Sequence, residues 1–164
     1  MNTNDTRATA FGFGQRKSWV FFAWWYPSII GFSGAVYALL ALIVGQDPGL
    51  GTSMMILGAA LATSGWVLTL KPRFTRKHPK PASDIPRVDQ GIRITPGIIW
   101  TVLGGAAILM VLLLLSVPEA ASPESLPVLG LLMAWPAGVS AGLAYTRWLM
   151  INSGRLYADW SNRG

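Results

Sequence analysis

Four long stretches without a charge in the middle dominate this 164-residue chain, and they cover residues 19–44, 50–70, 97–117 and 126–151. Roughly 20 helical residues are needed to cross the hydrocarbon core of a bilayer, and each stretch is at least that long. The hydrocarbon core offers no hydrogen-bond partners to backbone N–H and C=O groups, so a single segment that crosses it has to satisfy these groups internally as a helix. The sequence therefore predicts an all-α integral membrane protein with four transmembrane helices.

The composition agrees with lipid as the solvent. Hydrophobic residues make up 52% of the chain and charged residues only 12%, which leaves little polar surface for a water-facing shell. The first apolar stretch is longer than the core of a cleavable signal peptide, and no small-x-small site follows it. We expect it to remain as the first span.

The connections indicate how the spans are joined. Residues 45–49, Gly-Gln-Asp-Pro-Gly, form a short link rich in turn formers, which predicts an antiparallel hairpin of the first two spans. We expect Thr95 and Pro96 to start the third span and residues 122–124 to start the fourth. The expected organisation is an N-terminal segment 1–17, two hairpins packed as a four-helix bundle within 18–153, a loop 71–96 and a tail 154–164.

The basic residues all fall on one side of this arrangement. Three of the thirteen precede the first span, seven lie between the second and third, and three lie at or after the end of the fourth. The two opposite loops hold only Asp47, Glu119 and Glu124. Positive charges near span ends are retained in the cytoplasm. This pattern predicts a plasma (inner) membrane protein with cytoplasmic N- and C-termini and a cytoplasmic basic loop.

The basic loop contains the candidate contacts Arg73, Arg76 and Lys77. Attraction to anionic lipid headgroups contributes about 1 kcal/mol per basic residue near the surface, and an acidic face of a partner subunit is the alternative. Nucleic acid is a poor fit, because Phe74 is the loop's sole aromatic residue and its prolines oppose a recognition helix.

An aromatic run, WVFFAWWY, occupies residues 19–26 and ends at Pro27. One interpretation is an interfacial belt, with the span proper beginning at Pro27. The other is a stacking surface for a quinone, another pigment or a partner protein. The spacing does not separate these interpretations, and the candidate contact residues are Trp19, Phe22, Trp24, Trp25 and Tyr26.

Small residues recur at helical spacing in the spans. Gly138 and Gly142 form a GxxxG pattern, and Gly97, Thr101 and Gly105 repeat every four residues. Such stripes let helices approach closely, either within one chain or against another protein.

Two features near the end of the chain are also candidates. Pro136 should kink the fourth span and free the carbonyl of Leu132, for which Ser140 is a candidate partner. Tyr157 and Trp160 lie among polar residues in the tail, either as an interfacial anchor or as a docking contact for a partner.

The sequence contains few residues that could catalyse a reaction, carry an ion or bind a metal. The spans lack the ionisable groups that ion and proton transporters use, and no hydrolase, metalloprotease or phosphate-loop motif occurs. With no cysteine and a single histidine, His78, the chain cannot build a cysteine-ligated metal site or a bis-histidine haem. We therefore expect no enzyme activity, cofactor or metal. The leading hypothesis is a non-catalytic accessory, structural or assembly subunit of a larger membrane protein complex, whose aromatic face contacts lipid, quinone or pigment.

Four spans with cytoplasmic termini also resemble the small membrane subunits of substrate-binding-protein-dependent secondary transporters, in topology and length alone. That resemblance implies the alternative function, a small membrane subunit of a multi-component transporter. An enzyme that holds a phosphorylated lipid on the basic loop is a third hypothesis.

Overall fold

The computed structural model describes residues 3–70 and 79–162, and within this part of the chain the regular secondary structure is helical, with no strand. Four of its helices are long and apolar enough to cross a membrane. This confirms the prediction of an all-helical chain with four membrane-spanning helices. The elements are α1 Thr3–Ile43, α2 Gly49–Thr69, α4 Ile85–Ser116, the 3-10 turns η1 Pro118–Ala121 and η2 Pro123–Ser125, α5 Leu126–Ile151 and α6 Ser153–Ser161.

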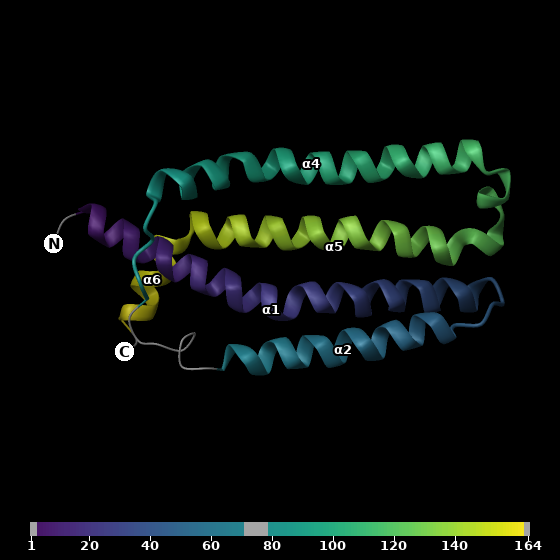
Figure 1. Cartoon of the computed structure of the whole chain (residues 1–164), viewed down its shortest axis with the longest axis horizontal. Helices are drawn as coiled ribbons and strands as arrows, with labels where there is room; N and C mark the ends of the chain where they lie inside the picture. The colour runs from purple at the N-terminus through teal and green to yellow at the C-terminus, as the bar shows by residue number, and fades with distance from the viewer. Residues whose placement is uncertain (1–2, 71–78, 163–164) are drawn as a thin grey trace.

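The four long helices lie in a row, in the spatial order α4, α5, α1, α2 (Figure 1). Helix α1 packs against α2 on one side and α5 on the other, while α4 packs against α5 and barely touches α1. The expected four-helix bundle is correct in helix number, but the helices do not surround a common axis. The physical reason is that α1 meets small residues on both of its neighbours, so both can approach it closely.

The seam between α1 and α2 is a backbone-to-backbone contact. A Cβ atom at Gly58 would collide with the backbone of Gly31, and one at Gly65 would collide with the carbonyl oxygen of Ala23. That carbonyl is four residues before Pro27, which lies inside α1 and has no N–H to donate to it. Glycine at position 65 therefore lets α2 lie directly against the carbonyl that the proline frees.

Helix α1 is longer than the sequence-based boundaries predict. Its 41 residues span about 61 Å at 1.5 Å per residue, twice the thickness of a hydrocarbon core of about 30 Å. The N-terminal segment is therefore not a separate irregular region, because from Thr3 onward it continues the first helix.

Helix α4 also begins earlier than predicted, at Ile85 and not at residue 97. Asp84 is its N-cap, with Oδ1 accepting a hydrogen bond of 2.9 Å from the backbone N–H of Arg87. Thr95 does not cap the helix, since its Oγ1 donates to the carbonyl of Gly91 at 2.7 Å. The prediction failed because Pro96 is tolerated inside α4.

The start of α4, the N-terminal half of α1 and helix α6 gather at one end of the row (Figure 1). Helix α6 packs against α1 there. The 21 residues of α2 cover about 31 Å, which is close to the thickness of a hydrocarbon core of about 30 Å. The extra turns of α1 and α4 extend past the end of α2, on the side where α6 lies (Figure 1).

At the other end, two loops contact each other. Gly45 has a positive φ of 75°, which glycine adopts without strain, and it ends α1. Gln46 Nε2 then donates to the carbonyl of Glu124 at 2.9 Å. This bond joins the α1–α2 connection to η2.

Adding one methyl group at Gly58 should loosen the α1–α2 seam. We expect Gly58→Ala to lower stability by about 1–3 kcal/mol, since the helices have to move apart, measured as a lower melting temperature in detergent. Gly104→Ala on α4 is the control, because nothing lies within 4 Å of the added atom. Equal melting temperatures of the two variants would contradict this account of the seam.

Candidate functional site

The structure divides the aromatic run into an inner and an outer face of α1. Phe21 is buried, and its ring centre lies 4.5 Å from that of Tyr145 on α5. Trp25 stacks on Phe21 at 5.2 Å. On the outer face, Trp19 is 67% exposed and lies 6.4 Å from Phe22.

The two remaining residues of the run lie beside these. The ring of Tyr26 is 5.2 Å from that of Phe22, and Trp24 lies 5.3 Å from Phe21, edge to face. Both are half-buried. Of the five candidate contact residues, Trp25 is thus the one whose indole enters the helix packing, and Trp19 is the most exposed to the surroundings.

The glycine pair on α5 is covered from within the chain. A Cβ at Gly142 would lie 2.6 Å from Nε1 of Trp25, and one at Gly138 would lie 2.9 Å from Cγ2 of Ile29. The Trp25 indole N–H donates to the carbonyl of Gly138 at 3.1 Å. Of the two roles open to this GxxxG pattern, the structure shows packing of α1 against α5.

The tail residues fold back onto the N-terminal half of α1. The ring centres of Tyr157 and Trp160 lie 5.8 Å and 5.5 Å from that of the buried Phe13. The guanidinium carbon of Arg16 lies 5.5 Å from the Phe13 ring centre and 5.7 Å from that of Trp160, within range of a cation–π interaction. Both tail aromatics thus hold α6 in place. Arg73, Arg76 and Lys77 of the basic loop lie outside the described residues.

A contact that the sequence analysis missed explains the proline inside α4. Pro96 has no N–H, so the carbonyl of Ile92 loses its helical partner. The Arg147 side chain of α5 replaces it, because Nε donates to the Ile92 oxygen at 3.1 Å. Arg147 therefore fastens α4 to α5 at the end of the spans. Pro four residues after a carbonyl is a signal in the sequence, but it does not reveal which helix supplies the donor.

Ser140 lies two helical turns before Arg147 on the same face of α5. Its hydroxyl is buried and has no hydrogen-bond partner in the described part of the chain. The expected bond from Ser140 to the carbonyl freed by Pro136 is therefore not formed.

Beside Arg147, the helices α1, α4 and α5 border an open cavity of about 560 Å³, which we call the three-helix cleft. Each helix contributes one face to it, and α5 contributes Thr146, Arg147 and Met150. The lining from the other two helices and the segment before α4 is Gln15, Ser18, Trp19, Phe22, Ser83, Asp84, Arg87, Val88, Gly91, Ile92 and Thr95.

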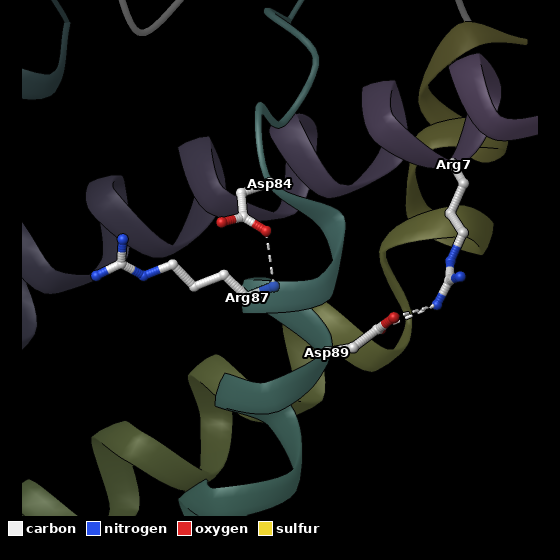
Figure 2. Close-up of polar contacts among 4 residues, drawn as sticks. All are labelled: Arg7, Asp84, Arg87 and Asp89. Carbon is white, nitrogen blue, oxygen red and sulfur yellow. Dashed lines mark hydrogen bonds and ion pairs between the residues drawn. The ribbon is translucent and has the colours of Figure 1, made fainter.

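The charged groups around the cleft differ in how they are engaged. Asp84 uses Oδ1 to cap α4 through the N–H of Arg87. Among the described residues, the Arg87 guanidinium has no hydrogen-bond or ion-pair partner. It extends away from the Arg7–Asp89 pair (Figure 2).

That pair lies at a second, neighbouring cavity of about 740 Å³ between α1, α4 and α6. Nη2 of Arg7 lies 2.9 Å and 2.8 Å from the two carboxylate oxygens of Asp89 (Figure 2). Both side chains are partly exposed, at 54% and 32%, so the pair contributes at most about 1 kcal/mol to stability. Its main effect is to neutralise the charge at this second cavity.

The chain thus has the fold of a multi-pass helical membrane protein, with a polar-rimmed cleft at one end of its spans. No protein-family model matches the chain, and no curated protein or solved structure is significantly similar to it. Within residues 3–70 and 79–162, no three histidine or acidic side chains converge as they would around a metal ion.

The contact between Arg147 and Ile92 can be tested by a double-mutant cycle. Arg147→Met leaves the Ile92 carbonyl unpaired, and we expect it to destabilise the chain by about 1–3 kcal/mol. Pro96→Ala restores the missing N–H, so the same Arg147 substitution should cost less in that background. Unfolding in detergent of the four variants measures the coupling, and strictly additive effects would refute the assigned contact.

Proposed function

We propose that this chain is a non-catalytic accessory subunit of a larger membrane protein complex in the plasma (inner) membrane. In this proposal its spans form two antiparallel hairpins, and both termini and the basic loop are cytoplasmic. The placement of all thirteen basic residues on one side supports the orientation. The sequence contains no catalytic motif on which an enzyme assignment could be based.

The proposal rests on one observation, which is that the rest of the chain leaves the surface of α4 largely uncovered. It is the most apolar of the four long helices, and none of its residues is buried. Gly97, Thr101 and Gly104 are all exposed and follow each other at intervals of four and three residues. Open space surrounds both glycines.

Other glycines of the chain are covered by a neighbouring helix, and this contrast indicates that the surface of α4 is a site for helix packing. Gly58 and Gly142 lie in seams that a neighbouring helix fills, whereas the stripe on α4 faces outward at the edge of the row. In lipid there is little hydrophobic drive between helices, so close packing at small residues is a principal source of association. A helix of a partner subunit is the occupant we propose for this stripe.

A leucine in the stripe should prevent partner binding while leaving the chain folded. We expect Gly104→Leu to abolish co-purification of the partner after gentle detergent extraction, identified by mass spectrometry. Ala60→Leu, which adds similar bulk on an exposed part of α2 at the opposite edge, should leave the partner bound. Extraction of the unmodified chain as a lone monomer would refute the accessory role.

The orientation has its own test. We expect alkaline phosphatase fused after Lys80 to be inactive and the same enzyme fused after Asp47 to be active, because it folds only outside the cytoplasm. A green fluorescent protein fusion at each position serves as the reciprocal control. Phosphatase activity at Lys80 would overturn the proposed topology.

A further inference from the structure

We propose that the three-helix cleft binds one anionic phospholipid, with the phosphate held by Arg87 and Arg147 and the glycerol backbone and upper acyl chains held by the apolar side chains that line the same cleft. The cleft, and not the basic loop as a whole, is then a defined lipid site. This inference is independent of the partner subunit proposed above, since the isolated chain contains the whole cleft.

The position of the cleft matches the boundary between headgroups and hydrocarbon. Gly65, close to the end of α2, lies against Ala23 of α1, so the membrane boundary on α1 falls near Trp19 and Phe22. Both of these residues line the cleft. On the other helices, the bond from Arg147 to Ile92 lies at the cleft as well, and Arg87 is more than one helical turn further toward the end of the row.

The donors needed for a phosphate are available. Arg147 uses Nε for the Ile92 carbonyl, and its two terminal nitrogens have no partner in the described part of the chain. The guanidinium of Arg87 is entirely uncommitted there. Guanidinium groups bind phosphate oxygens through charge-assisted hydrogen bonds, which are about twice as strong as neutral ones.

The charge balance of the cleft favours an anion. Arg87 and Arg147 face it with one carboxylate, Asp84, which is already an acceptor at the start of α4. The other nearby acid, Asp89, is paired with Arg7 at the neighbouring cavity. The cleft therefore keeps one net positive charge, and Gln15, Ser83, Thr95 and Thr146 add neutral polar groups.

The apolar side chains separate a lipid from a soluble phosphate. Trp19, Phe22, Val88 and Met150 line the same cavity as the two arginines. A free phosphate ion would leave this surface bare, whereas the glycerol backbone and acyl chains of a phospholipid would cover it. Basic pockets between spanning helices on the cytoplasmic side are suited to acidic lipid headgroups.

The test titrates the purified full-length chain in detergent with phosphatidylglycerol and with phosphatidylcholine of the same acyl chains, followed by native mass spectrometry. We expect one phosphatidylglycerol to bind more tightly than phosphatidylcholine. Arg87→Gln should weaken phosphatidylglycerol binding by about 10-fold or more. Arg93→Gln removes the same charge from α4 outside the cleft and should leave the affinity unchanged.

A steric variant tests the site without removing any charge. Gly91 lines the cleft, and nothing lies within 4 Å of a Cβ added there. Gly91→Leu should therefore fold normally, fill the cleft and weaken phosphatidylglycerol binding by at least the same factor. Gly104→Leu, on the opposite face of α4, is its matched control and should bind the lipid normally.

Three results would overturn the inference. Equal losses in Arg87→Gln and Arg93→Gln would show a diffuse charge effect, and equal binding of the two lipids would show that the cleft does not select an anionic headgroup. Saturation of the cleft by glycerol phosphate without acyl chains would show a soluble phosphate site. If the arginine variants fail to fold, quenching of Trp19 by phosphatidylglycerol with brominated acyl chains, compared with Trp19→Phe, decides the question.

Discussion

The close approach of α1 to both of its neighbours is the constraint on which the rest of the structure depends. Gly58 and Gly65 bring α2 onto the backbone of α1, and Gly138 and Gly142 admit Ile29 and Trp25 on the side of α5. Spanning helices associate through close contacts and hydrogen bonds, because lipid tails are as apolar as the helices themselves. Because α1 lies between α2 and α5, its contact with α5 fixes the position of α5. The position of α4 is fixed in turn by its contact with α5.

Prolines inside the spans create a second requirement, since each one frees a carbonyl that lipid cannot satisfy. The structure places two of these carbonyls at helix contacts, whereas Ser140 makes no bond to the carbonyl freed by Pro136. The carbonyl freed by Pro27 lies against Gly65, where the helices touch, and the carbonyl freed by Pro96 accepts a hydrogen bond from Arg147. A basic residue at the end of a span thus contributes to helix packing.

Helix α4 connects the two proposals while keeping them on separate surfaces. With 3.6 residues per turn, Gly91 in the cleft is rotated about 120° from Gly97 and about 140° from Gly104, the two outward glycines. One side faces α1 across the cleft, where Arg147 supplies a cation, and the other faces away from the row. Because α4 is joined to the rest of the chain mainly at α5, it can bind a lipid on one side and a partner helix on the other.

The sequence by itself determined the four spans, their helical state and the grouping of the basic residues, because these depend only on the length, polarity and order of segments along the chain. The starts of α1 and α4 were harder to predict. Thr95 and Pro96 have the pattern of a helix start, but Asp84 caps α4 eleven residues earlier, and an interior proline is acceptable when another helix satisfies the freed carbonyl.

Only the tertiary structure decided the order of the helices in the row, which glycine stripe is covered and which is open, and the existence of the cleft. Arg147 and Ile92 are 55 residues apart, and nothing in either local sequence indicates the other. Any small-residue stripe can pack against any other in a bilayer, so the choice among them depends on shapes that side chains form only when the helices are assembled.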